Sequence, residues 1–319
     1  MNVSRGMTPE SSAITAAMLF PEDPDSRNEA LAAGERAVWL AAHTADEISD
    51  ETIQGAALVI RGEDGVLLVW PPRTAPSLER RIEDDIQAVL LAAIQEVLRI
   101  AVEEALHEPV AYAQALSDEQ DLQRYASLQR IGFEHAGRIV FLGKDLAGAE
   151  PATFRTPNSS DGEWRTVSFD ELGDPALFER LLDETLVGSL DLPCLEGLRS
   201  GAQMLAGQRG SPRFSSQLTR VAFVKNRPVA VGMLCEDSDR ATVEVAYLGV
   251  VAGERGHKYG GRLLNELEQR ATARGQRWMI LAVDITNHFA IDVYNDAQYV
   301  ALFAREVFLW RPTGSPPSN

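Results

Sequence analysis

The sequence predicts an α/β protein of two domains, each a twisted mixed β-sheet flanked by helices. Apolar segments typical of strands alternate with segments of helical periodicity along the chain. The 319 residues suffice for two cores of ordinary size, and the 45% apolar content favours packed domains over disorder. A polar segment rich in Gly and Pro separates two halves of similar length.

Charge and cysteine content narrow the classes of function. The chain has 47 acidic and 30 basic residues, a net charge of −17, so it lacks the cationic field that nucleic acids and anionic membranes attract. Cys194 and Cys235 have no neighbours at metal-ligand spacing and imply no disulfide framework. The apolar runs are far shorter than the ~20 residues that span a bilayer, and the N-terminus lacks the shape of a cleavable signal. We expect a cytoplasmic protein with no nucleic-acid, membrane or metal partner.

The middle of the chain predicts a domain boundary. Residues 143–163, GKDLAGAEPATFRTPNSSDGE, have linker composition and no periodic apolar residues. The domains expected from this are 1–147 and 166–312, with a linker at 148–165 and a disordered tail at 313–319.

The two halves end in related segments, LQRIGFEHAGRIVFLG (128–143) and YNDAQYVALFAREVFLW (294–310). Alignment with one residue's difference pairs Gly132-Phe133 with Gln298-Tyr299 and Phe141-Leu142 with Phe308-Leu309. Each segment follows a longer helix and a strand. An internal duplication is the favoured interpretation, and a chance match of short segments is the alternative.

The second half opens with two strands joined by a turn at 225–228, KNRP. A third strand, ATVEVAYLG (241–249), is apolar at nearly every position, which predicts burial on both faces. A helical apolar stripe follows from Leu263 to Ala271, with Glu266 and Arg270 at i,i+4 spacing and Gly275 placed to end the helix.

Between the third strand and this helix lies VVAGERGHKYGG (250–261). A strand-to-helix corner gathers unpaired N–H groups and the positive end of the helix dipole, which together bind phosphate. Its glycines allow a close approach of the main chain to a ligand, and Arg255 and Lys258 can add positive charge. The spacing fits neither the P-loop nor the dinucleotide motif. A tight connection that merely needs glycine is the alternative.

The corner resembles the acetyl-CoA loop of the GNAT N-acetyltransferase family, whose motif is Arg/Gln-x-x-Gly-x-Gly/Ala, often seen as RGxGxGxxLL. RGHKYGGRLL (255–264) matches this run at Arg255, Gly256, Gly260 and Leu263-Leu264. It departs from the family at Lys258, where glycine is usual.

A second family motif, N-x-x-A-x-x-x-Y followed by Gly-Phe, is similar to the segment that begins at Asn287. Asn287, Ala290 and Tyr294 fit the motif, while Gln298-Tyr299 stands in place of Gly-Phe. The likeness covers roughly residues 220–310, and 166–211 by position alone.

The resemblance implies direct transfer of an acetyl group from acetyl-CoA to an amine of a small molecule or peptide. The corner would cradle the pyrophosphate, and residues 248–250 would pair with the pantetheine arm and offer an N–H to the thioester oxygen. The cofactor-binding residues expected are Leu248, Gly249, Val250, Arg255, Gly256, His257, Lys258, Tyr259, Gly260, Gly261 and Asn287.

Glu244 and Tyr294 are the catalytic candidates that the resemblance supplies. Tyr294 would protonate the departing thiolate, and Glu244 would accept the amine proton directly or through water. A core tyrosine would show the same helical pattern as Tyr294, and an ion-paired residue on a splayed strand would explain Glu244 equally well. Asn287 suits a helix N-cap as well as a cofactor contact. Asp284, at a strand end, could reach an amine.

The first half has the same order of elements but lacks the chemistry. At its corner the sequence PPRTAPSLERRIEDDIQ (71–87) has no glycine and carries carboxylates that would repel a pyrophosphate. Leu128 aligns with Tyr294 and has no proton to donate. We therefore expect a degenerate first copy and an active second one. The alternatives are a non-catalytic acyl-CoA-binding or scaffold protein, and a non-enzyme whose corner is merely structural.

Overall fold

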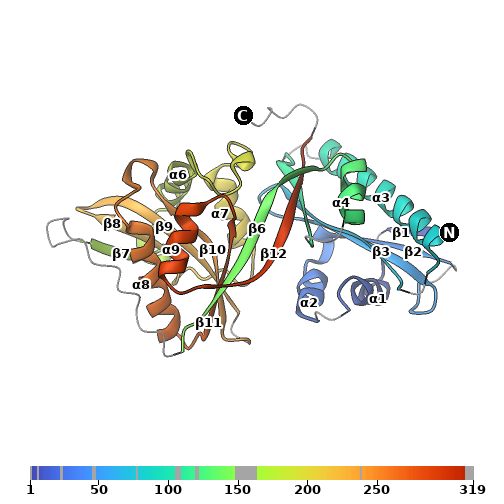
Figure 1. The fold of residues 1–319 in the computed structure, drawn as a ribbon, viewed down its shortest axis with the longest axis horizontal. Helices are drawn as coiled ribbons and strands as arrows, with labels where there is room; N and C mark the ends of the chain where they lie inside the picture. Colours follow the sequence, from blue (N-terminus) through green and yellow to red (C-terminus); the bar gives the residue numbers. More distant parts are fainter. Residues whose placement is uncertain are drawn as a thin grey trace. The chain divides into compact units, whose positions relative to one another are not determined.

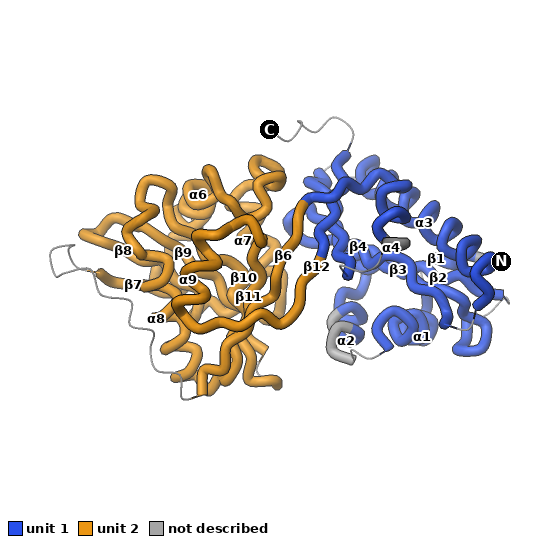
Figure 2. Tube along the Cα trace, in the orientation of Figure 1, with its two compact units in different colours: residues 1–136, 306–316 blue, residues 137–305, 317–319 orange. Residues whose placement is uncertain are grey.

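A computed structural model describes residues 2–5, 7–21, 24–44, 48–76, 78–104, 109–118, 122–147, 164–237 and 239–312. The chain divides into two compact units (Figure 2). Unit 1 comprises residues 1–136 and 306–316, and unit 2 comprises residues 137–305 and 317–319. Almost all of the expected linker and the expected tail lie outside the described residues.

Unit 1 carries the first set of strands and helices (Figure 1). Its elements are β1 (Asn2–Arg5), α1 (Pro9–Leu19), α2 (Pro24–Ala32), η1 (Gly34–Arg36), β2 (Ala37–His43), β3 (Ile53–Arg61), β4 (Val66–Thr74), α3 (Arg80–Glu103), β5 (Tyr112–Ser117) and α4 (Leu122–Arg130). Two long strands then belong partly to each unit, β6 (Glu134–Asp145) and β12 (Val300–Trp310).

Unit 2 carries a similar set. Its elements are β7 (Trp164–Ser168), α5 (Phe169–Leu172), α6 (Pro175–Leu186), η2 (Pro193–Leu195), α7 (Gly201–Arg209), β8 (Arg220–Val224), β9 (Arg227–Asp237), β10 (Thr242–Val250), η3 (Ala252–Glu254), α8 (Tyr259–Ala273), β11 (Trp278–Asp284) and α9 (His288–Asp296). Among the described residues, no helix combines the length and apolar character needed to cross a membrane.

The strand orders of the two units correspond. Unit 1 runs β1-β2-β3-β4-β5-β12, and unit 2 runs β7-β8-β9-β10-β11-β6. Within the two units the strand pairings are antiparallel except β4 with β5 and β10 with β11, which are parallel. Each parallel step spans four residue pairs, 66–69 with 112–115 and 242–245 with 278–281. The mixed sheets predicted from the sequence are therefore present.

The last strand of each half pairs in the sheet of the other unit. Residues 306–310 of β12 pair with β5 in unit 1, and residues 139–145 of β6 pair with β11 in unit 2. The sequence predicted both strands but not the sheet that each one joins. Antiparallel neighbours follow the same period-2 pattern whichever sheet they join, so the pattern does not specify the partner.

Helices cover both faces of the unit 2 sheet. Alternate residues of β8 face opposite ways: Val221 and Phe223 pack with α6 and α7, and Ala222 and Val224 pack with α8 and α9. In unit 1, α3 and α4 pack on one face and α1 on the other. The face under α8 buries the stripe that begins at Leu263, as its spacing predicted.

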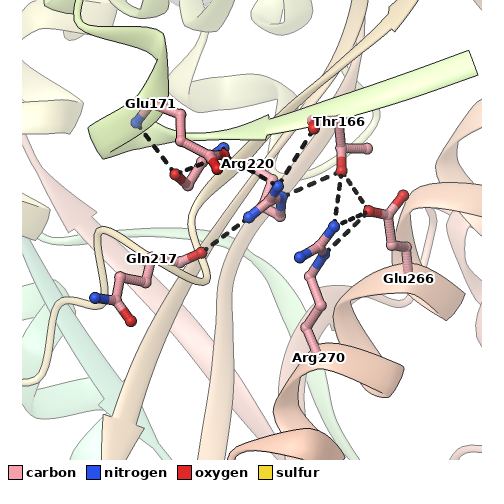
Figure 3. Close-up of polar contacts among 7 residues, drawn as sticks. Thr166, Glu171, Gln217, Arg220, Glu266 and Arg270 are labelled. Carbon is pink, nitrogen blue, oxygen red and sulfur yellow. Dashed lines mark hydrogen bonds and ion pairs between the residues drawn. The ribbon is translucent and has the colours of Figure 1, made fainter.

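Polar contacts link α8 to the edge strand β7 (Figure 3). Arg270 donates to Glu266 at 2.7 Å, the i,i+4 pair that the sequence predicted. The Thr166 hydroxyl donates to the Glu266 carboxylate, and Arg220 donates to Thr166 at 3.2 Å. These bonds fix the position of the helix whose first turn belongs to the candidate site.

Equivalent helix ends support the internal duplication. Gly132 and Gln298 both have positive φ, +87° and +66°. The next amide bonds back five residues in each copy, Phe133 N to Leu128 O at 3.1 Å and Tyr299 N to Tyr294 O at 3.0 Å. The strand pairing needs no inserted residue: the partner of residue 117 is 306, and the partner of 283 is 140. The one-residue difference in the sequence alignment was therefore wrong.

Candidate functional site

Strands β10 and β11 separate at the site. Their parallel pairing ends at Val245 and Leu281, after which β10 stays paired with β9, and β11 with β6. A bulge in β10 lies between Val245 and Tyr247, at the same point. Burial on both faces, expected from the apolar sequence, is not found: only Val243 and Val245, which point to the face under α8, are fully buried. Residues 246–250 are half-buried because the sheet opens beside them. Leu248, Gly249 and Val250 thus border this opening.

Gly249 packs closely against α6 and the Tyr247 side chain, which leave no room for a Cβ. A Cβ there would lie 2.8 Å from the Thr185 Cβ and 2.8 Å from the Tyr247 ring and hydroxyl. The Thr185 hydroxyl donates to the Leu182 carbonyl at 2.8 Å, so it accepts from the Tyr247 hydroxyl, also at 2.8 Å. These contacts hold the end of β10 against α6.

The corner between β10 and α8 is short and partly left-handed. It passes through η3, then Gly256 at φ +84° and Lys258 at φ +61°, the residue that precedes α8. A Cβ on Gly256 would meet no heavy atom within 4 Å, so the positive φ is the reason for glycine there. Lys258 adopts a conformation that most residues avoid, which marks the point where the sequence departs from the family motif.

Free amides gather at this corner. Among the described residues, none accepts a hydrogen bond from the backbone N–H of Gly256, His257, Lys258, Gly260 or Gly261. The first amide of this stretch with an intrahelical partner is Arg262 N, which bonds Lys258 O at 3.2 Å. Gly256, His257 and Lys258 are exposed, so their donors are open to an anion.

Arg255 is occupied by the protein itself. Its guanidinium donates to the carbonyls of Gly188 and Thr185, each at 2.9 Å. Both carbonyls lie at the C-terminal end of α6, where a cation is favourable. Arg255 therefore connects the corner to α6 through its side chain, and its charge is not directed solely at a ligand.

The neighbouring rings form a small stack. His257 packs on Tyr259 with ring centroids 5.4 Å apart, and its Nδ1 donates to Glu254 O at 3.2 Å. Tyr259 is buried, and its ring centroid lies 5.9 Å from that of Trp164. These contacts hold the first turn of α8 rigid while its amides stay open.

Tyr294 lies on α9, packed in the core under α8 and α9. It is 6% exposed, and its hydroxyl has no hydrogen-bond partner in the described part of the chain. Burial raises the pKa of Tyr294, with further contributions from Asp191 and Tyr247, so the phenol stays protonated at neutral pH.

Glu244 and Asn287 have partners of their own. Glu244 lies on the paired part of β10, with its side chain 40% exposed and Oε2 3.8 Å from Arg213 Nη2. Burial and then Glu244 raise the pKa of the adjacent Cys235 thiol to about 11, so that thiol is not a ready nucleophile. The Asn287 side chain accepts from Ala290 N at 3.3 Å and caps α9, the alternative that its position allowed.

Sequence reasoning missed the loop after α6. The Asp284 amide donates to Asp191 Oδ1 at 2.8 Å, and Leu192 N donates back to Asp284 Oδ2 at 3.3 Å. Asp284 is 2% exposed, and its Oδ1 accepts two bonds from Thr286 at 2.7 Å. The sequence VGSLDLP (187–193) carries no recognisable motif, and nothing local links it to a strand 93 residues away.

The corresponding corner of unit 1 is different. The Thr74 hydroxyl donates to Glu83 Oε1 at 3.1 Å, which places a carboxylate between the end of β4 and the first turn of α3. Leu128, the counterpart of Tyr294, is fully buried. This corner would repel a diphosphate.

The sequence and the structure were compared with those of known proteins. Residues 200–298 match the model of the Acetyltransferase (GNAT) family. No curated protein matches the sequence significantly.

Several solved structures share the fold. A GCN5-related N-acetyltransferase from Sphaerobacter thermophilus is 16% identical, with TM-score 0.62 over 100% of this chain and 98% of that one. A tandem GNAT protein from the clavulanic acid biosynthesis pathway is 14% identical, with TM-score 0.59 over 99% of both. A glucosamine N-acetyltransferase region of a fungal multi-domain β-N-acetylglucosaminidase is 13% identical, with TM-score 0.65 over 97% of this chain and 38% of that one.

Proposed function

We propose that the protein transfers an acetyl group from acetyl-CoA to an amine, with the chemistry in unit 2. The match of residues 200–298 to the GNAT family model and the likeness of the fold to a tandem GNAT protein support this proposal. The observation that carries the proposal is the set of five amides, from Gly256 to Gly261, without an acceptor among the described residues. Backbone donors at a helix N-terminus suit the diphosphate of the nucleotide.

The opening beside β10 suits the pantetheine arm and the thioester of acetyl-CoA. The half-buried residues 248–250 have main-chain groups turned away from β9, and an extended pantetheine arm can pair with them as an added strand. One of those N–H groups would then stabilise the oxyanion that forms on the thioester carbonyl. Asn287 would border the same channel while capping α9.

The family resemblance offers one candidate for each proton transfer. Tyr294 would donate its phenolic proton to the departing thiolate, because its hydroxyl is protonated and has no competing partner in the described chain. Glu244 is the base candidate that the family resemblance supplies. Its pairing with Arg213 favours action through a water molecule over direct contact.

Binding and turnover test the proposal separately. Calorimetry with acetyl-CoA should give one site per chain, and CoA thiol release should rise when an amine is added. Binding without turnover would favour the non-catalytic alternative, for which left-handed Lys258 and the ion-paired Glu244 are the supporting features. Failure to bind acetyl-CoA would contradict both and leave the corner as a structural connection.

A further inference from the structure

The loop after α6 brings an acidic side chain to the open end of the sheet. Asp191 precedes η2, and one of its oxygens, Oδ1, is fixed by the backbone amide of Asp284 at the end of β11. Its other oxygen has no hydrogen-bond partner in the ranges that the structure describes. The carboxylate is thus held in place with one acceptor atom to spare.

Asp191 is accessible although protein surrounds it. The residue is exposed, yet desolvation by the surrounding protein raises the pKa of its carboxyl, and the Asp284 carboxylate raises it further. Asp284 differs from it, because the bonds from Leu192 and Thr286 occupy both of its oxygens.

Tyr294 lies on α9, the helix that follows the end of β11 to which Asp191 is bonded. The side chain is more than nine-tenths buried, its hydroxyl has no hydrogen-bond partner within the described residues, and Asp191 and Tyr247 act on its charge. The helix and the loop that adjoin the end of β11 therefore each carry a group with spare hydrogen-bonding capacity. Tyr247 itself is used in its bond to Thr185.

We infer that Asp191 binds the ammonium group of the acceptor and takes its proton, so that the acceptor is a cationic primary amine without a carboxylate beside the nitrogen. This rests on the proposed function. It places the proton-accepting carboxylate at Asp191 rather than at Glu244, whose carboxylate is paired with Arg213 on the paired part of β10.

The proton balance uses both groups. One N–H bond of the ammonium breaks as Asp191 becomes protonated, and that proton then passes to water. The neutral nitrogen attacks the thioester carbon, and the C–S bond breaks. Tyr294 gives its proton to the sulfur and regains one from the new amide nitrogen. The products are the N-acetyl amine, CoA thiol and one released proton.

The charged groups around Asp191 set the pH dependence. Asp284 on β11 and the phenols of Tyr247 and Tyr294 face it, while Arg255 and Arg199 act on Tyr247. Ionised Asp191 extracts a proton from the cationic amine, so kcat/KM should be flat between the pKa of Asp191 and that of the amine. Without this carboxylate the reaction must draw on free neutral amine, and kcat/KM should rise about tenfold per pH unit.

The test compares Asp191→Asn with Glu244→Gln and with Glu184→Gln, which removes an exposed charge from the neighbouring helix α6. Acceptors are benzylamine, 1,4-diaminobutane, glucosamine and the pair tyramine and tyrosine, which differ by one carboxylate. Asparagine keeps an oxygen for the Asp284 amide, so the loop should hold, as an unchanged Tm would verify. Asp191→Asn should lower kcat/KM about 100-fold with the best amine and convert the flat pH profile to a rising one.

The wild-type protein should also prefer tyramine to tyrosine by at least about tenfold, and Glu184→Gln should behave as wild type. A wild-type-like rate and pH profile in Asp191→Asn, or the altered profile in Glu244→Gln instead, overturns the inference. So does wild-type protein that binds acetyl-CoA but acetylates none of these amines. Absence of acetyl-CoA binding would instead remove the proposed function.

Discussion

Units 1 and 2 share a scaffold and differ at the places where chemistry would occur. Both have the same strand order, a four-pair parallel step, a bulged central strand and a left-handed residue after the last helix. Both strand-to-helix corners have helix amides without an acceptor among the described residues, but unit 1 adds the carboxylate of Glu83, bonded to Thr74, at its corner. The apolar cores maintain the same fold in both units, and under the proposed function the few corner residues that differ decide which unit can bind a nucleotide.

The largest expected effect is the loss of turnover when Tyr294, whose counterpart in unit 1 is Leu128, loses its hydroxyl. Tyr294→Phe should lower turnover about 100-fold with little change in acetyl-CoA affinity, because only the proton donor is lost. Steady-state kinetics and calorimetry measure the two quantities. The control is Tyr299→Phe, whose enclosed hydroxyl faces Glu268 and should leave turnover close to wild type. Equal effects of the two changes would remove Tyr294 from the mechanism.

The same side chain carries a pH prediction. Burial raises the pKa of Tyr294 above its ordinary value of ~10, so the acid form persists as the pH rises through that value. Turnover should therefore show no alkaline loss from Tyr294 below about pH 10. A Tyr294-dependent alkaline limb near pH 8 in the kcat profile would contradict the assignment.

The next largest effect tests whether acetyl-CoA binding depends on the unit 2 corner and not on the unit 1 corner. Lys258→Glu should weaken acetyl-CoA binding about tenfold, or about 1.4 kcal/mol, and the loss should shrink at high salt. Arg80→Glu makes the matching change at the first turn of α3 in unit 1, where Arg80 is exposed. Calorimetry should find that change silent. Equal weakening by both variants would mean that unit 1 also binds the donor.

The smallest effect concerns the shared left-handed cap. Gln298→Gly should stabilise the protein by up to about 1 kcal/mol, because glycine adopts φ +66° without strain. The reciprocal change Gly132→Ala should destabilise it by about 1 kcal/mol. Urea unfolding curves would measure both. The same sign for the two substitutions would show that the caps are not equivalent.

The sequence predicted the elements well because strands and amphipathic helices follow local periodicity. The hairpin at Lys225 and Asn226 and the stripe from Leu263 to Ala271 are confirmed. The corner, too, was visible, since glycine spacing and a helix start are local features. Burial of β10 was overestimated, because the opening of the sheet depends on where two distant strands part.

Contacts between residues far apart in the sequence could not be predicted from local patterns. The exchange of β6 and β12 depends on which sheet offers an edge, and the attachment of Asp191 to β11 joins residues far apart in sequence. Arg255 fits the loop motif by type, but its bonds to the α6 carbonyls arise from the fold.

Hydrogen exchange with and without acetyl-CoA tests the central claim most directly. Saturating acetyl-CoA should slow exchange of the amides from Gly256 to Gly261, while those from Glu79 to Glu83 at the unit 1 corner stay unchanged. Unchanged exchange at residues 256–261, or protection at residues 79–83 instead, would contradict the assignment of the donor site to unit 2.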